Sequence, residues 1–212
     1  MKIIPASYEI LTPIDGADIL RRIEAAGRVC YKSEDTITDG SAERFVANVI
    51  KRGHESVIEH VSLSVKFIVD RGVSHEIVRH RIASYSQEST RYCNYSQDKF
   101  GRELTFIRPC FWVKGGRAYE IWKAAMEAAE RDYIRLTDKL ECGATPEQAR
   151  AILPNSLKTE IVVTMNLREM RHFLRLRTDK AAHPQMREVT VPLLAELKSR
   201  IPVVFDDLEA QV

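Results

Sequence analysis

The sequence predicts an α+β fold in which a mixed or antiparallel sheet is flanked by helices, in a single domain over residues 1–212. Three observations support this prediction. Apolar and polar side chains alternate over residues 61–69, which is typical of a strand with one buried face. Residues 117–140 form a long Ala-rich stretch that is typical of a helix. A length of 212 residues with 44% hydrophobic content is sufficient for one core.

The remaining elements follow from periodicity and from turn residues. Period-two runs and β-branched residues predict strands at 2–11 (interrupted by Pro5), 61–69, 104–107 and 157–165. Amphipathic periodicity predicts helices at 15–26, 42–52, 74–81, 117–140, 146–152, 166–176 and 184–198. Thr145 before Pro146 has the form of a helix N-cap. Residues 83–97 are rich in hydroxyls and amides and poor in aliphatic side chains, so we expect a loop there.

Charge and composition restrict the class of protein. The net charge of +2, from 32 basic and 30 acidic residues, argues against a protein that coats nucleic acid through a general positive surface. The basic residues comprise 21 Arg and 11 Lys, and an Arg surplus indicates either anion-binding sites or compositional bias of the genome. No apolar stretch approaches the roughly 20 residues of a membrane helix, and the N-terminal residues do not resemble a signal peptide, so we expect a cytoplasmic protein without a membrane partner.

Cysteine and histidine spacing gives no indication of a metal. Cys30, Cys93, Cys110 and Cys142 contain no Cys-x-x-Cys pair, and we expect four reduced thiols. The pairs His54/His60 and His75/His80 lack the i, i+4 spacing of a helical zinc site, and the zinc-deaminase pattern is absent. Neither a G-x-G-x-x-G motif nor a Walker loop is present, which excludes both standard phosphate cradles.

Arg79-His80-Arg81 is the sharpest local feature of the chain. On the predicted helix the two guanidinium groups would point about 200° apart and could bind two different anions. The alternative is a solvated basic helix end. Hydroxyl, amide and aromatic side chains that suit phosphates and bases follow within residues 84–95. Ser89 could also be a nucleophile, but this role needs a neighbouring base that the sequence does not show.

A second cluster of basic residues lies on the helix predicted from Asn166. Its apolar face comprises Leu167, Met170, Phe173 and Leu174, and the opposite face comprises Arg168, Arg171, His172 and Arg175. Arg177 falls back onto the apolar side. Either the helix ends just before Arg177, or its guanidinium is held in a desolvated place with an accepting partner.

These motifs together resemble one family, the flavin-dependent thymidylate synthases. Arg79-His80-Arg81, seven further residues and then Ser89 match the hallmark of that family. Three other segments resemble its flavin, nucleotide-phosphate and C-terminal segments, namely Gly53-His54-Glu55-Ser56 with Glu59-His60, Ala149-Arg150-Ala151-Ile152-Leu153-Pro154, and 166–177.

The resemblance implies an activity and a set of ligands. The family converts dUMP to dTMP, with methylenetetrahydrofolate as carbon donor and FAD reduced by NADPH as hydride source. Its mechanism needs no cysteine nucleophile and no metal. Instead, the Arg177 guanidinium would lie against the uracil and stabilise its N3-deprotonated form electrostatically. The family assembles as a homotetramer with sites shared between subunits.

The resemblance also implies which residues bind each ligand. The residues for dUMP are Glu76, Arg79, Gln87, Glu88, Ser89, Thr90, Arg91, Arg150 and Arg177. The residues for FAD are His54, Ser56, Glu59, Arg79, His80, Arg81, Gln87, Asn166, Arg168 and His172. Three positions depart from the common pattern: Glu76 stands where members often have Gln, Gln87 where some have Glu, and His172 where Asn is also found.

Two other functions are compatible with the residues themselves. One is a non-catalytic nucleotide- or RNA-binding module that uses the Arg and Tyr residues of 79–95 for phosphate contacts and stacking. The other is a flavoprotein with an oxidase-like activity alone. Flavin absorbance of the purified protein separates the module from the enzyme, because only the enzyme would bind FAD.

Overall fold

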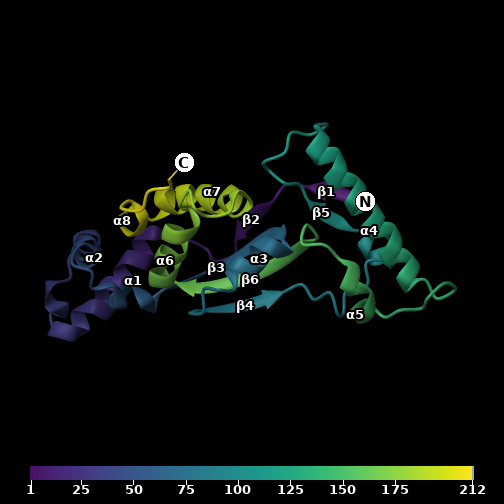
Figure 1. Cartoon of the computed structure of the whole chain (residues 1–212). Coiled ribbons are helices and arrows are strands. Elements are labelled where there is room, and N and C mark those ends of the chain that lie inside the picture. Colours follow the sequence, from purple (N-terminus) through teal and green to yellow (C-terminus); the bar gives the residue numbers. More distant parts are fainter. Residues whose placement is uncertain (212) are drawn as a thin grey trace. The chain divides into compact units, whose positions relative to one another are not determined.

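The computed structural model describes residues 1–211, and its strands and helices alternate along the chain (Figure 1). The strands are β1 (Lys2–Ile4), β2 (Ser7–Ile10), β3 (Ser62–Asp70), β4 (Ala83–Gln87), β5 (Thr105–Ile107) and β6 (Lys158–Asn166). The helices are α1 (Gly16–Arg28), α2 (Ser41–Lys51), α3 (Arg71–Ile77), α4 (Arg117–Thr137), α5 (Pro146–Ala149), α6 (Leu167–Arg177), α7 (Pro184–Arg200) and α8 (Pro202–Phe205). These elements confirm the predicted α+β class.

The strands form two sheets. β1 pairs with β5 in parallel, with Lys2 opposite Thr105, and the other sheet has the strand order β2-β3-β6-β4. β3 alternates as the sequence predicts, because Leu63, Val65 and Phe67 are buried and the residues between them are not. The prediction of a mixed sheet with helices is therefore confirmed, and β3 has the predicted face in the core.

The chain divides into two compact units, each made of three segments. Unit 1 comprises Met1–Ser7, Phe67–Arg79 and Ser86–Ile161, and unit 2 comprises Tyr8–Lys66, His80–Tyr85 and Val162–Val212. Because the segments interleave along the sequence, no single cut of the chain separates the units. The prediction of one domain over 1–212 stays a prediction.

Each unit has its own apolar core. In unit 1, helix α4 contributes Tyr119, Trp122 and Tyr133 to a cluster with Phe106 of β5 and Leu157. In unit 2, helices α1 and α2 pack together, as do α6 and α7 and the pair α7 and α8. Their buried faces include Ile23, Val46, Phe173 and Leu193. No helix within residues 1–211 combines the length and the apolar character that crossing a bilayer requires.

Most predicted elements are found within a few residues of their predicted bounds, but two predictions are wrong. The helix predicted at 74–81 begins at Arg71, because the Asp70 carboxylate accepts a hydrogen bond from the Val73 amide and caps it, and it ends at Ile77. The loop predicted over 83–97 begins with strand β4, whose backbone pairing with β6 overrides its polar composition. The capping box of Thr145 with Gln148 confirms the helix start predicted there.

Candidate functional site

The Arg79-His80-Arg81 segment lies in the turn between α3 and β4, not on a helix. The prediction that helical geometry would separate the two guanidinium groups is therefore wrong. Burial separates the three residues in another way, because Arg79 and Arg81 are exposed and His80 has only 5% of its surface exposed. His80 and Arg81 belong to unit 2, whereas Arg79 ends a segment of unit 1.

His80 is the centre of a hydrogen-bonded chain in unit 2. Nε of Arg177 donates to Nε2 of His80 over 3.0 Å, and Nδ1 of His80 lies 3.3 Å from Oε1 of Glu169. A guanidinium nitrogen can only donate, so Nε2 is the accepting nitrogen and Nδ1 carries the proton that points to Glu169. The three side chains thus form one directional relay, from Arg177 through His80 to Glu169.

The imidazole of His80 is neutral at physiological pH. Burial, the positive charge of Arg177 and the electrostatic effect of the neighbouring His172 together lower the pKa of His80 to about 4. Its contact with Glu169 is consequently a hydrogen bond from a neutral ring and not an ion pair. A neutral ring is also what the donation from Arg177 requires, since a protonated imidazole has no acceptor.

The surroundings of His80 hold this geometry. Glu169 is 8% exposed, and burial raises the pKa of its carboxyl group. The Tyr85 hydroxyl of β4 donates to the backbone carbonyl of His80, and burial and the nearby Glu169 charge raise the pKa of Tyr85 to about 12. The ring of Phe173 meets the imidazole edge-on at a centroid distance of 4.9 Å. The ring therefore cannot rotate without losing several contacts.

Arg177 is the last residue of α6 and is half-buried. Of the two alternatives that the sequence leaves open, the second holds: the helix includes Arg177, and its guanidinium has an accepting partner in His80. The backbone carbonyl of Arg177 also accepts a hydrogen bond of 2.7 Å from the Thr190 hydroxyl of α7. Other segments of unit 2 therefore hold both the backbone carbonyl and the guanidinium of Arg177.

The prediction for Arg171 is wrong. The sequence places Arg171 on the polar face of α6, but its side chain is 1% exposed. Its guanidinium forms ion pairs with Asp207 at 2.6 Å and with Glu55 at 3.2 Å, and it also donates to the Val204 carbonyl. The helical wheel failed because the C-terminal segment covers this side of α6 and supplies the acceptors that a buried guanidinium needs.

His80, Glu169 and His172 present one potential metal-ligand atom each within 4.8 Å of one another, which sequence spacing did not reveal. The hydrogen-bonding pattern argues against a dication at this place. The Nδ1 position of His80 carries a proton, and the Arg177 guanidinium is 3.0 Å from the other ring nitrogen. A second positive charge beside that guanidinium would be repelled in a poorly solvated environment.

Four of the residues predicted for FAD line one cavity of about 450 Å³ in unit 2. They are Glu59, Asn166 at the end of β6, and the α6 residues Arg168 and His172, and Arg175 lies with them. Arg168 forms an ion pair of 2.6 Å with Glu59 across this cavity. The side-chain oxygen Oδ1 of Asn166 caps α6 by accepting a hydrogen bond from the backbone amide of Glu169 over 2.9 Å. The amide group of Asn166 is thereby oriented by the helix that it caps.

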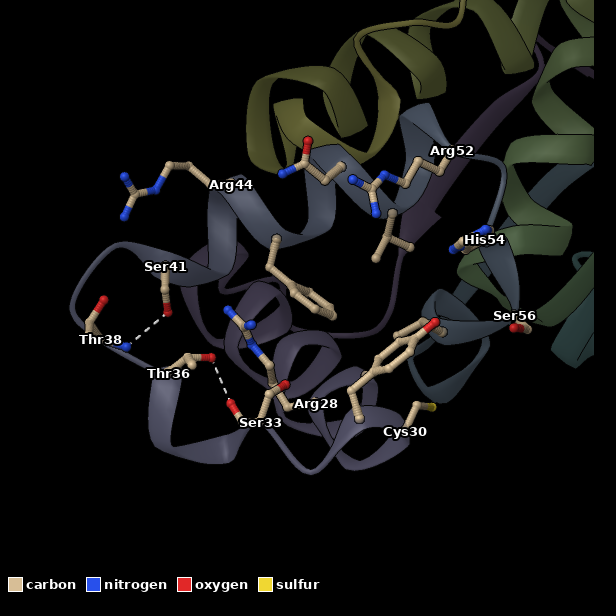
Figure 2. Close-up of a pocket in the computed structure, with 16 residues that line it drawn as sticks. Arg28, Cys30, Ser33, Thr36, Thr38, Ser41, Arg44, Arg52, His54 and Ser56 are labelled. Atoms are coloured by element: carbon tan, nitrogen blue, oxygen red, sulfur yellow. Dashed lines mark hydrogen bonds between the residues drawn. The ribbon is translucent and has the colours of Figure 1, made fainter.

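Two further residues predicted for FAD, His54 and Ser56, line a different cavity of unit 2, of about 740 Å³ (Figure 2). Its walls come from the end of α1, the turns that follow it, and α2. Both side chains are exposed. The predicted flavin residues of unit 2 are thus distributed over two cavities, the buried His80 and the exposed Arg81.

Gln87 and Glu88, two residues predicted to bind dUMP, have partners within unit 1. The Gln87 amide donates to the hydroxyls of Ser74 at 2.9 Å and Thr159 at 3.2 Å. Glu88 accepts from the Tyr95 hydroxyl and forms an ion pair with Lys158, each at 2.9 Å. The structure therefore gives these two side chains a role in joining β4 to its neighbours, and their contact with dUMP stays a prediction.

Apart from Arg177 of unit 2, the other residues predicted for dUMP lie on one turn and at three more places of unit 1. In the turn after β4, Thr90 is buried, the Ser89 hydroxyl accepts from the Arg91 amide, and Arg91 forms an ion pair of 2.9 Å with Glu147. The remaining three are Glu76 on α3, exposed Arg79 and exposed Arg150. Arg150 begins a single 3₁₀ turn directly after α5. Within residues 1–211, no hydrogen bond or ion pair joins Arg79, Ser89 and Arg150 to one another. That these residues meet around one dUMP therefore stays a prediction.

Comparison with known proteins decides the family. The family model described as "Thymidylate synthase complementing protein" matches residues 14–203. The chain belongs to the flavin-dependent thymidylate synthase family. The flavin-dependent thymidylate synthase of Geobacter sulfurreducens is 34% identical over 192 residues, which cover 87% of this chain and 80% of that protein. That of Pyrococcus furiosus is 36% identical over 175 residues, which cover 82% and 70% of the two chains.

A solved structure shows the same fold. A crystal structure of thymidylate synthase X from Helicobacter pylori with FAD and dUMP superimposes with a TM-score of 0.74. The two sequences are 22% identical, and the match covers 96% of this chain and 98% of that one. At this identity the likeness establishes the fold, and the ligands belong to the Helicobacter protein.

Two residues of the candidate site were missed from the sequence. Glu169 was assigned no role, although it accepts from His80 and is buried. Glu55 stands within the matched Gly53–Ser56 segment, but its ion pair with buried Arg171 was not expected. The only available signal was that Glu169 falls between the basic and apolar faces of α6, which does not reveal a partner eighty-nine residues away.

Proposed function

We propose that the chain catalyses the reductive methylation of dUMP to dTMP, with methylenetetrahydrofolate as carbon donor and with FAD reduced by NADPH. The observation that supports this most directly is the half-buried Arg177 guanidinium, held by the neutral imidazole of His80 within a chain of this family. A fixed cation in a poorly solvated place stabilises an anion that forms beside it without further reorganisation.

Arg177 is the group that activates the uracil. Its positive charge favours the N3-deprotonated, enolate-like form of the ring and so raises the nucleophilicity of C5 without a covalent bond to the protein. His80 and Glu169 act as positioning residues, because they fix the plane of the guanidinium through Nε. The four cysteines form no disulfide within residues 1–211 and have no part in this mechanism.

The residues of unit 2 suit a flavin dinucleotide. The cavity lined by Asn166, Arg168 and His172 presents guanidinium, imidazole and amide donors for pyrophosphate oxygens, with the Glu59 carboxylate available to ribose hydroxyls. When bound, FAD supplies the hydride that completes the methyl group. A cavity of about 450 Å³ encloses only part of a dinucleotide. This agrees with the proposal that the active protein is a homotetramer in which neighbouring subunits complete each site.

The dUMP phosphate is assigned to guanidinium and hydroxyl groups of unit 1. Arg79 and Arg150 are exposed and able to rearrange around a phosphate, and Arg91 is held by a solvent-exposed ion pair that a dianion can displace. Ser89 and Thr90 stand beside Arg91 on the same turn. Each charge-assisted hydrogen bond to phosphate contributes about 1.5–3 kcal/mol, so a few such contacts suffice for micromolar binding.

An anaerobic assay tests the proposal. The purified protein is incubated with dUMP, methylenetetrahydrofolate, FAD and NADPH, and dTMP is measured by chromatography. We expect dTMP only when all four are present, and the same yield after treatment with EDTA, because no step needs a metal. Reduction of the flavin without dTMP in the complete anaerobic mixture, followed by continued NADPH oxidation once oxygen is admitted, would overturn the proposal and indicate an oxidase. Colourless protein that takes up no FAD would also overturn it.

A further inference from the structure

The cavity of about 740 Å³ in unit 2 is lined by several basic side chains besides the residues predicted for FAD. Three guanidinium groups, those of Arg28, Arg44 and Arg52, line it together with His54, and none of the described residues that line it is acidic. Its volume lies in the range of sites that hold small organic ligands. A concave surface with this charge attracts an anion.

Arg28 belongs to the framework of the cavity. Its Nε and terminal nitrogen donate to the Glu24 carboxylate over 3.1 and 2.7 Å, and the Ser41 hydroxyl donates to the other oxygen of Glu24 over 2.7 Å. Glu24 is buried, so its charge is balanced by Arg28. This leaves Arg44 and Arg52 as the cations whose charge is available to a ligand.

Arg44 belongs to α2, and Arg52 directly follows the last residue of this helix. Within residues 1–211, neither Arg44 nor Arg52 forms an ion pair, and both side chains are exposed. Figure 2 shows Arg52 pointing inward from the end of α2 and Arg44 pointing outward on the opposite side. Arg52 is therefore the cation in place for an anion inside the cavity, and Arg44 is a cation at its rim.

Aromatic side chains accompany these charges. Tyr31 lines the cavity although 81% of its surface is exposed, and Phe45 lines it beneath the Arg28 guanidinium, whose carbon is 4.7 Å from the ring centroid. Exposed aromatic faces beside guanidinium groups bind planar rings that carry negative charge, because stacking and charge attraction act together. An adenine nucleotide has this combination of features.

We propose that this cavity binds the adenosine end of NADPH, with Arg52 as the ligand of its 2′-phosphate and Tyr31 as the surface on which adenine stacks. The inference rests on the proposed function and deepens it, because it assigns residues to the reductant. His54 and Ser56, which are predicted for FAD, share the rim, so a dinucleotide anchored here begins beside the flavin residues of the same unit. The 2′-phosphate is a dianion that NADH lacks, and Arg52 is the guanidinium in place to bind it.

The test uses FAD-loaded protein and adenosine 2′,5′-bisphosphate as a probe that cannot react. Isothermal titration calorimetry measures its dissociation constant for the natural chain, for Arg52→Gln, and for Arg22→Gln as a matched control. Arg22 is exposed on α1 in the same unit and does not line the cavity. We expect Arg52→Gln to raise the dissociation constant at least tenfold and Arg22→Gln to change it less than twofold. Equal constants for all three proteins would overturn the proposal.

A second measurement follows the bleaching of flavin absorbance after anaerobic mixing with NADPH or NADH, without dUMP. Arg52→Gln should raise the half-saturating NADPH concentration about tenfold and leave that of NADH within twofold. A loss of bound FAD from Arg52→Gln would instead assign the cavity to the flavin nucleotide. In the dTMP assay, an effect of Arg52→Gln on half-saturation by methylenetetrahydrofolate alone would assign the cavity to folate carboxylates. Either result overturns the proposal. Flavin bleaching that never leads to dTMP refutes the proposed function but leaves this assignment standing.

Discussion

Nε of Arg177 lies 3.0 Å from Nε2 of His80, and this hydrogen bond joins two residues that are ninety-seven positions apart in the chain. It connects the end of α6 to the Arg-His-Arg segment, the two features that the sequence alone marks as most unusual. The bond requires a neutral imidazole, and burial beside Arg177 and His172 provides one by lowering the pKa of His80 to about 4. The catalytic cation proposed here is thus oriented by a histidine that does not carry a charge.

Replacing Arg177 tests the mechanism directly. Arg177→Ala should reduce dTMP formation below detection because no other group takes over the stabilisation of the uracil anion. The flavin content, read from the absorbance of the purified protein, should equal that of the natural chain. Arg21→Ala, which removes an exposed guanidinium on α1, serves as the control. Unchanged turnover of Arg177→Ala would remove this residue from the mechanism.

The depressed pKa of His80 predicts how stability depends on pH. Below its ordinary pKa of 6.5 the unfolded chain binds a proton that the folded chain refuses until about pH 4. The His80 contribution to the free energy of unfolding is therefore complete above pH 6.5 and is lost progressively as pH falls to 4, by on the order of 1–3 kcal/mol.

Urea unfolding of the natural chain and of His80→Gln at several pH values checks this expectation. The decrease in unfolding free energy between pH 6.5 and 4 should be smaller in the variant, because glutamine does not titrate. Burial raises the pKa of Glu169, which acts in the opposite direction, but Glu169 is present in both proteins and its effect largely cancels in the comparison. Parallel pH profiles for the two proteins would contradict a buried neutral His80.

The buried guanidinium of Arg171 predicts a large effect on stability. Arg171→Met removes the cation and leaves Glu55 and Asp207 without the partner that holds the pKa of Asp207 below its usual range. Breaking a buried ion pair from one side typically costs about 3–5 kcal/mol, and thermal unfolding should detect it. Arg168→Met, on the exposed side of the same helix, should have little effect. Similar midpoints for both variants would show that the Arg171 pairs contribute nothing net.

Arg150 is expected to bind the dUMP phosphate. Arg150→Ala should raise the dissociation constant for dUMP at least tenfold, which corresponds to about 1.4 kcal/mol. Equilibrium titration of flavin fluorescence or calorimetry measures this directly, with Arg131→Ala on α4 as a control for an exposed guanidinium in the same unit. Unaltered affinity would exclude Arg150 as a phosphate ligand.

Local signals in the sequence predict most of the elements correctly. The alternation over 61–69 appears as β3, and the Thr145 cap appears as a capping box, because both depend on interactions between near neighbours in the chain. Of the two errors, one has a long-range cause and the other a local one. Strand β4 forms from a polar stretch because β6 offers it backbone partners, and α3 starts early because Asp70 caps it.

What the sequence by itself determines is the family, the order of the elements and the residue types of the site, because short motifs and periodicity carry this information. Only the tertiary structure decides which charged side chains are desolvated and what neutralises them. Arg171 and Glu169 have unremarkable places in the sequence of α6, and the Arg-His-Arg motif does not show that its histidine is the buried member, yet Arg171, Glu169 and His80 are all buried. The physical reason is that solvation depends on every segment packed around a group, and partners such as Asp207 and Arg177 are brought there only when the chain folds.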